Sequence, residues 1–156
     1  MPSRRTILSA TGTGLTCGLG GCSSLFSSNV PSIESKNVEV VGSECVKESE
    51  RQRNATISYD STQHQLSISG VTVTDSPCAE LYINPDKGVG KSELKDDAYQ
   101  IIVGMLSGEC EPCPAEVEYD ATVEFSHDPS TIYVYHTEEV DDRLRPVGPV
   151  TSKNIR

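Results

Sequence analysis

The chain has 156 residues, and its 23 acidic side chains outnumber its 13 basic ones, which gives a net charge of −10 at pH 7. This charge disfavours nucleic acid and anionic lipid surfaces as partners, and it suits solubility in concentrated salt, where charge repulsion is screened. The length is sufficient for one hydrophobic core but not for two. With no Trp and two Phe, that core has to consist mostly of aliphatic residues, Ala and Tyr.

The first 21 residues have the pattern of an export signal. Arg4 and Arg5 follow Ser3 and precede an uncharged stretch, which is the arrangement of a twin-arginine signal for proteins exported in the folded state. From Ile7 to Gly21 the stretch is only mildly apolar, and it is shorter than the roughly 20 apolar residues that span a bilayer. We therefore predict that residues 1–21 are a twin-arginine signal peptide.

The signal ends in Leu19-Gly20-Gly21-Cys22, which resembles the lipobox of bacterial and archaeal lipoproteins. The resemblance implies that Cys22 carries lipid and becomes the new N-terminus, so that lipid chains alone attach the protein to the membrane. The alternative is an ordinary cleaved signal with a coincidental cysteine. Residues 22–37 are rich in Ser and predict a flexible tether. Without residues 1–21, eleven basic residues remain against 23 acidic ones, a net charge of −12.

Alternation of apolar and polar residues predicts short β-strands through residues 38–137. Residues 38–41 are the first predicted strand, and residues 57–59 and 66–68 predict a hairpin around the polar turn Asp60 to His64. At Gly70 the apolar phase shifts, which is typical of a glycine bulge. Residues 81–83 predict a strand that ends at a turn from Asn84 to Gly88.

The second half of the predicted domain continues with a predicted single helical turn at 92–97 and a continuous apolar strand at 99–106, which suits a central position in a sheet. Residues 115–125 alternate apolar residues with acidic ones and predict one long half-buried strand. The turn His127-Asp128-Pro129 follows, and we expect residues 132–135 to complete a hairpin with that strand.

These elements predict an all-β fold, a single antiparallel β-sandwich of the immunoglobulin-like kind with about seven strands over residues 38–137. Residues 138–156 are charged, contain proline and lack a sustained period. We expect this segment to be a disordered tail.

Four cysteines remain once Cys22 is assigned to lipid, and an even number in an exported domain predicts two disulfides. They can pair in three ways, between which the spacing does not distinguish; the four are Cys45, Cys78, Cys110 and Cys113. Asn54 begins an Asn-Ala-Thr sequon at the head of a predicted strand, which makes it a candidate glycosylation site.

The sharpest candidate for chemistry is Cys110-Glu111-Pro112-Cys113. A C-x-x-C pair works as a thiol-disulfide redox centre when a helix N-terminus stabilises the attacking thiolate. Here Pro114 and a long strand follow the motif, so we expect each cysteine to bond to a different distant partner. The alternative is an envelope thiol-disulfide protein in which Cys110 and Cys113 bond to each other.

Other site chemistries have weaker support. A copper or zinc site would combine these two thiols with Met105, His127 or His136, but zinc would need a second paired motif, which the sequence lacks. The scattered acidic residues do not form a calcium loop, although capture of divalent cations at a saturable site of the acidic surface is a third possibility. The sequence also lacks the hydrolase and phosphate-loop motifs. We therefore predict no metal site, no cofactor and no catalytic residue.

The folded part resembles small lipoproteins and secreted β domains of halophilic archaea. Five segments carry the resemblance: Gly42-Ser43-Glu44-Cys45, Ser76-Pro77-Cys78, Cys110-Glu111-Pro112-Cys113, Val117-Glu118-Tyr119 and Tyr133-Val134-Tyr135-His136. The resemblance implies twin-arginine export of a lipoprotein with an acidic surface. It supplies no catalytic residue, because that group has no assigned chemistry. The polar stretch from Asn84 to Gly90 departs from the group and has the character of an insertion.

Together these features predict a lipid-anchored, non-enzymatic module on the extracellular face of the cell membrane, with a binding or envelope-associated role. The predicted contact surface is the pair of loops Asn84 to Lys91 and Asp60 to His64, because loops on a rigid scaffold commonly carry binding. The expected partners are the membrane, through lipid on Cys22, and an envelope ligand that the sequence does not identify.

Overall fold

A computed structural model of the chain describes residues 30–87, 97–106, 108–140 and 143–156. The predicted signal with Arg4 and Arg5, the predicted lipidation site Cys22 and most of the predicted tether lie outside the described residues. Residues 88–96, which include most of the predicted helical turn and part of a predicted contact loop, lie outside them as well.

The described residues form eight β-strands and one short 3₁₀ helix. The strands are β1 (Ile33–Cys45), β2 (Asn54–Asp60), β3 (Gln65–Thr74), β4 (Glu80–Lys87), β5 (Tyr99–Leu106), β6 (Ala115–Phe125), β7 (Thr131–Val140) and β8 (Arg143–Asn154). The 3₁₀ helix, η1, covers Glu48–Glu50. Within this part of the chain, no helix has the length and the apolar character needed to cross a membrane.

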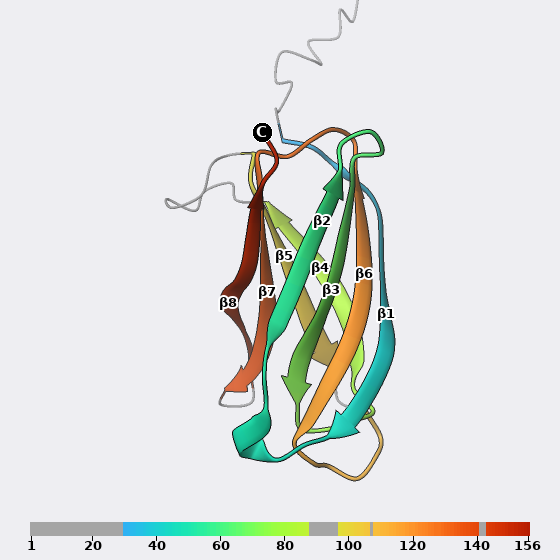
Figure 1. The fold of residues 1–156 in the computed structure, drawn as a ribbon, viewed down its shortest axis with the longest axis vertical. Helices are drawn as coiled ribbons and strands as arrows, with labels where there is room; N and C mark the ends of the chain where they lie inside the picture. Colours follow the sequence, from blue (N-terminus) through green and yellow to red (C-terminus); the bar gives the residue numbers. More distant parts are fainter. Residues whose placement is uncertain (1–29, 88–96, 107, 141–142) are drawn as a thin grey trace, which may run out of the picture.

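The strands make two four-stranded sheets that pack face to face, which confirms the predicted β-sandwich (Figure 1). One sheet has the order β1-β6-β3-β2, and the other has the order β4-β5-β7-β8. All pairs are antiparallel except β5 and β7, which run parallel. This parallel pair and the eighth strand are differences from the seven-stranded immunoglobulin order, in which neighbours are antiparallel. As expected, β5 is central in its sheet.

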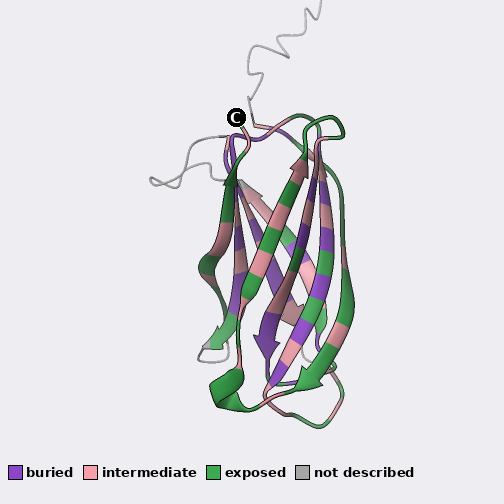
Figure 2. Ribbon diagram, in the orientation of Figure 1, coloured by how far each residue is buried: buried purple, intermediate pink, exposed green. Residues whose placement is uncertain are grey.

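The core lies between the sheets and is aliphatic and tyrosine-rich, as the composition predicts. Strand β6 shows the predicted alternation most clearly, because its apolar residues are buried and its acidic residues lie on the outer face (Figure 2). Tyr99 and Phe125 pack edge to face with ring centroids 5.1 Å apart. The largest fully buried side chains also include Tyr119, Leu66, Ile68, Ile101, Ile132 and His136.

One predicted hairpin is confirmed and the other is wrong. Strands β2 and β3 pair as expected, with Ile57 opposite Ile68 and Tyr59 opposite Leu66. Strands β6 and β7, in contrast, belong to different sheets, so residues 126–130 cross from one layer to the other. Alternation identifies a strand with one buried face, but both sheets of a sandwich offer such a face.

The predicted bulge at Gly70 is also wrong, because β3 pairs with β2 and β6 without a register shift at this residue. The apolar phase shifts because Thr72 occupies an inward position, whereas Val71 and Val73 pair with outward residues of β6. A Cβ at Gly70 would stand 2.6 Å from the carbonyl oxygen of Asn54 and 2.9 Å from the Tyr119 hydroxyl. The glycine is therefore required by close packing. The predicted turn at Asn84 is likewise replaced by strand, since β4 continues to Lys87.

The folded unit is longer at both ends than residues 38–137. Strand β1 begins at Ile33, within the predicted tether, and the predicted disordered tail forms β8, which pairs with β7. Both are edge strands with few buried side chains, so their sequences lack alternation. In β8 only Val147, Val150 and Thr151 are partly buried. Backbone hydrogen bonds to β7 hold this strand in place of side-chain burial.

The sandwich has two distinct ends, which we call the entry pole and the base (Figure 1). The entry pole contains residues 30–32, the β2–β3 turn, the β6–β7 loop and Arg156. There the Ser32 amide donates to the Ser126 hydroxyl at 2.9 Å, and the Tyr99 hydroxyl donates to the carbonyl of Pro31. These contacts fix the point at which the N-terminal segment joins the fold. The base contains η1, the ends of β1, β3, β5 and β7, and both disulfides.

Candidate functional site

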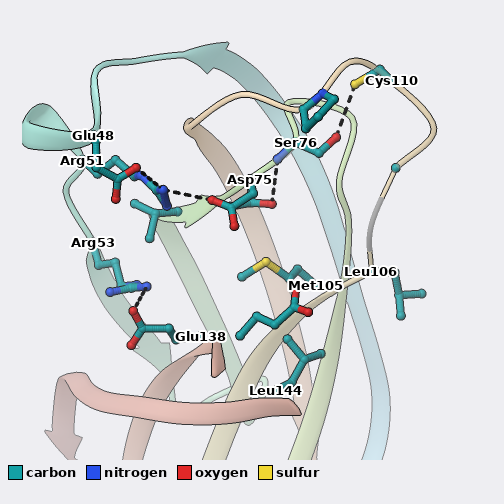
Figure 3. Close-up of a pocket in the computed structure, with 15 residues that line it drawn as sticks. Glu48, Arg51, Arg53, Asp75, Ser76, Met105, Leu106, Cys110, Glu138 and Leu144 are labelled. Atoms are coloured by element: carbon teal, nitrogen blue, oxygen red, sulfur yellow. Dashed lines mark hydrogen bonds and ion pairs between the residues drawn. The ribbon is translucent and has the colours of Figure 1, made fainter. Parts of the chain in front are cut away.

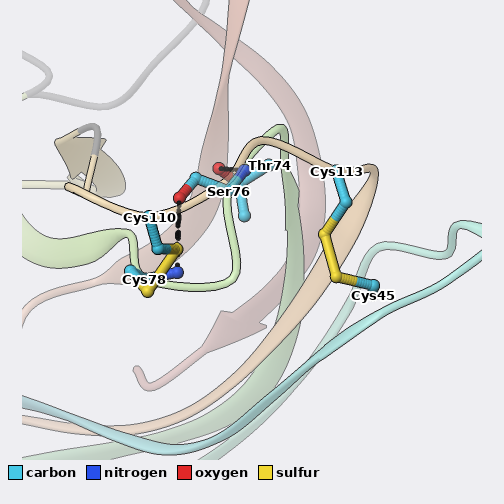
Figure 4. Close-up of a disulfide and its surroundings, with 6 residues drawn as sticks. All are labelled: Cys45, Thr74, Ser76, Cys78, Cys110 and Cys113. Atoms are coloured by element: carbon cyan, nitrogen blue, oxygen red, sulfur yellow. Dashed lines mark hydrogen bonds between the residues drawn. A yellow bond between two sulfur atoms is a disulfide. The ribbon is translucent and has the colours of Figure 1, made fainter.

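Two disulfides join the loops of the base (Figure 4). Cys45 bonds to Cys113 and Cys78 bonds to Cys110, with Cα–Cα distances of 5.9 and 6.0 Å. The two cysteines of the C-x-x-C motif therefore have different partners, as predicted. The first disulfide links the end of β1 to the segment before β6, and the second links the loop after β3 to the loop after β5.

Hydrogen bonds fix the same loops around the disulfides. The Cys113 amide donates to the carbonyl of Asp75 at 3.0 Å, and the Val46 amide donates to that of Pro114 at 2.8 Å. The Ser76 hydroxyl accepts a hydrogen bond from the Cys78 amide and lies 3.3 Å from Cys110 Sγ. The loops are therefore a rigid frame, because both covalent and backbone contacts hold them.

This frame surrounds a cavity of about 600 Å³ at the open end of the sandwich (Figure 3). Its walls come from both sheets and from the stapled loops. One wall is polar and contains Arg51, Arg53 and acidic neighbours, whereas another is apolar. The apolar wall consists of Val73, Met105, Leu106 and Leu144. Leu106 and Leu144 are 54% and 39% exposed, so this wall is accessible to a ligand.

Two arginines with alternating spacing line the polar wall. Arg51 pairs with Asp75 at 2.9 Å and with Glu48, and Arg53 pairs with Glu138 at 3.5 Å. Among the residues that the structure describes, the Nε atoms of both arginines are buried without a hydrogen-bond partner. The ion pairs are made through Nη2, and the unpartnered Nε leaves a part of each guanidinium's donor capacity unused.

Behind Arg53, the two sheets are linked by a buried polar contact. The Tyr119 hydroxyl lies 2.8 Å from His136 Nε2, and His136 has no solvent exposure. Burial lowers the pKa of His136 to about 4, and the charge of Arg53 contributes to this shift. Burial also raises the pKa of the Tyr119 hydroxyl. Both groups are therefore neutral at pH 7 and provide a hydrogen bond without burying charge.

The side chains that line the cavity are suited to binding. Four carboxylates and two guanidinium groups provide ion pairing and hydrogen bonds, and the aliphatic wall provides apolar contact. Cys110 Sγ is committed to a disulfide, so the nearby Ser76 hydroxyl has no thiolate or imidazole beside it in the lining. An activated nucleophile would need such a base within hydrogen-bonding distance.

The structure separates most of the residues considered for a metal site. Met105 lines the cavity near Cys110, but His136 is buried between the sheets and His127 lies at the entry pole. Within the described ranges, no group of three or more His, Cys, Asp or Glu side chains is arranged to hold a metal ion. Asn54 is exposed at the start of β2, so the predicted sequon is accessible. Its glycosylation stays a prediction.

The arginines of the cavity were not among the predicted site residues. Their signal in the sequence is Arg51-Gln52-Arg53, a local pair of positive charges in a strongly acidic chain. The predicted contact loop from Asp60 to His64 lies at the entry pole, on the opposite end from the cavity. No protein-family model, curated protein or solved structure matches the chain.

Proposed function

We propose that this protein is a lipid-anchored, non-enzymatic binding module on the extracellular face of the cell membrane, with the cavity at the base as its ligand site. The proposal combines the export signal and the lipobox-like Cys22 with the position of the cavity. The observation that carries it is that this cavity lies at the pole opposite the point where the N-terminal segment joins the fold.

The length of the segment between Cys22 and the fold limits how far the entry pole can lie from the bilayer. Seven residues lie between Cys22 and Val30 in the sequence, and the eight Cα–Cα steps that join the two reach roughly 30 Å at most when fully extended. The 13 residues of β1 then run from the entry pole to the base over roughly 40 Å. A lipid on Cys22 therefore keeps the entry pole close to the bilayer. The cavity projects away from the bilayer, toward ligands of the envelope or the medium.

The chemistry of the base supports binding in preference to redox catalysis. The thiol-disulfide alternative requires Cys110 and Cys113 to exchange with each other, and in this fold each is bonded to a residue from another segment. Disulfides that staple loops in this way are typical of small exported domains with lean cores.

The attachment is tested by the intact mass of the protein extracted from membranes, with thiols alkylated before and after reduction. We expect a lipid on Cys22 and no alkylation until the protein is strongly reduced. The Cys22→Ala variant should be released into the medium. A cleaved protein without lipid would contradict the anchor, and labelling of Cys110 and Cys113 under mild reduction would favour the redox alternative.

The orientation is tested on intact cells with a bulky polyethylene-glycol maleimide. Glu48→Cys places a thiol on the base, and Gln63→Cys places one in the exposed turn at the entry pole. We expect Glu48→Cys to react much faster on cells and the two variants to react equally after detergent extraction. Equal rates on cells would contradict the proposed orientation.

A further inference from the structure

Tyrosines are distributed unevenly over the fold. The chain has six, of which Tyr59, Tyr99 and Tyr119 pack in or against the core. The other three lie in strands of the β4-β5-β7-β8 sheet, at positions that alternate with buried residues. Tyr82 precedes the buried Ile83, and Tyr133 and Tyr135 flank the buried Val134. All three are therefore on the outer face of that sheet, where they are half-buried.

Two of these rings lie beside glycines of neighbouring strands. Tyr82 is opposite Gly104, and its ring occupies the space that a Cβ at residue 104 would fill. Tyr135 packs beside Gly148 of β8, with Cδ1 3.6 Å from the Cβ position. Gly104 and Thr137 are buried although they face outward. The Tyr82 ring thus covers Gly104 on the outer surface of the sheet.

The rest of this face is polar but has little charge at its centre. The register places Asn84 opposite Ile102, and it places Gln100 beside Tyr133. Ser152 follows on the far side of Tyr133. The basic residues of β8 pair with inward positions, since Arg145 is opposite Glu138 and Lys153 is opposite Ile132. Asp86 lies on the edge strand β4, opposite Gln100, and Glu80 lies at the lower margin, opposite Leu106.

The outer face of the other sheet is different. There β6 presents four carboxylates, and its neighbours contribute serine hydroxyls and further acidic residues. For example, Ser69 donates to Asp120 at 2.6 Å, and Ser35 donates to Glu124 at 2.7 Å. A cationic partner would bind to that acidic face. The aromatic face of the β4-β5-β7-β8 sheet suits an uncharged partner.

We propose that this aromatic face, centred on Tyr82, Tyr133 and Tyr135, binds a neutral glycan chain. The C–H groups of a pyranose ring pack on the electron-rich face of an aromatic ring. Amide side chains such as Asn84 and Gln100 both donate to and accept from sugar hydroxyls. On the described parts of β4, β5 and β7, Ile102 is the one aliphatic side chain that faces outward between Tyr82 and Tyr133, whereas protein interfaces have apolar centres. The exposed Leu106 lies at the lower margin of the face.

This site is separate from the cavity at the base and does not depend on the lipid anchor. A glycan bound here would lie along the long axis of the sandwich, because Tyr133 and Tyr135 succeed each other on β7. Sugar rings of an extended chain would thus contact successive tyrosines. Failure of this proposal leaves the anchored binding module of the preceding section unaffected, since the two use different residues.

The test is native gel electrophoresis of the full chain, in non-ionic detergent, through gels that contain dextran, mannan or galactan. We expect at least one of these neutral polymers to retard the protein. Tyr82→Ala and Tyr133→Ala should each weaken the binding by about tenfold, the scale of one lost stacking contact. The matched control is Val40→Ala, which truncates an exposed side chain of the other sheet and should bind normally.

Thermal unfolding of each variant shows whether the fold is kept. If Tyr82→Ala fails to fold, Tyr133→Ala tests the binding instead, because the Tyr133 ring does not pack against any of the described glycines. The proposal is overturned if no neutral polymer retards the protein, if retardation occurs only with the acidic polymer hyaluronate, or if the tyrosine variants bind like the control. A dimer that Tyr133→Ala dissociates would also overturn it, because the face would then bind a second copy of the chain.

Discussion

Buried polar residues give this sandwich a pH-dependent stability. His136 is neutral in the folded protein because burial lowers its pKa to about 4, whereas in the unfolded chain it titrates near 6.5. Between these two values the unfolded state binds the proton and the folded state does not, so stability decreases as the pH decreases through this window. Below about pH 4 both states are protonated and this contribution is constant.

We expect His136 to account for a loss of about 3 kcal/mol of unfolding free energy between pH 6.5 and pH 4. His136→Leu should be less stable than the parent at pH 7, because the Tyr119 hydroxyl loses its partner. It should also lack this part of the pH dependence. Urea unfolding at several pH values measures both effects, with His127→Gln as a control. If the unfolding free energy of His136→Leu depended on pH as strongly as that of the parent, His136 would not be the source of this pH dependence.

At the scale of single elements, the sequence predicts strands better than it predicts their neighbours. Residues 115–125 were predicted correctly because every second residue is apolar and buried. Strand β8 was missed and β1 was predicted only over residues 38–41, because each lies at a sheet edge and buries few side chains. Edge strands are held by backbone hydrogen bonds, which leave no periodic signal in the side chains.

The candidate site was harder to predict than the strands. Pro114 and the strand that follows predict that Cys110 and Cys113 do not bond to each other, but the sequence does not identify Cys78 and Cys45 as their respective partners. The cavity cannot be predicted from the sequence either, because Arg53, which precedes β2, and Leu144 of β8 line it from segments far apart in the chain. Such contacts depend on the strand order, and the strand order includes a parallel pair that local patterns do not indicate.

The two disulfides lead to a prediction about stability, again at the scale of single elements. Removal of either should cost about 4 kcal/mol of stability by the loop-entropy relation. The Cys45→Ala/Cys113→Ala protein should be less stable than the Cys78→Ala/Cys110→Ala protein by about 0.7 kcal/mol. The reason is that the bond it lacks closes a sequence separation of 68 residues, whereas the other bond closes one of 32. Guanidinium unfolding measures the difference. In Cys113→Ser, mass spectrometry after alkylation should find the free thiol at Cys45, and labelling of Cys110 would contradict the pairing.

For the whole molecule, the acidic surface predicts stabilisation by salt. Carboxylates oppose each other across β1 and β6, where Glu39 faces Asp120 and Glu44 faces Glu116. Directly opposed like charges destabilise a sheet, and the screening length decreases from about 8 to about 3 Å between 0.15 and 1 M salt. The melting temperature should therefore increase with potassium chloride over this range.

The matched variant for this prediction is Glu39→Gln/Glu44→Gln, which removes one charge from each opposed pair. Its melting temperature at low salt should exceed that of the parent, and it should increase less on addition of salt. Differential scanning calorimetry provides both values. If salt raised the melting temperature of both proteins equally, the opposed carboxylate pairs would not be the cause of the salt effect.

The strand order also determines when the chain can fold during its synthesis. Translation releases β1 first, yet Ile33 pairs with Phe125, and β3 needs the same strand β6 as its second neighbour. Neither sheet is complete until most of the chain has left the ribosome, since β5 also waits for β7. Such non-local pairing is slow to form. A ribosome that stalls before residue 115 therefore leaves β1 and one edge of β3 without a partner, and unpaired edges of this kind are templates for aggregation.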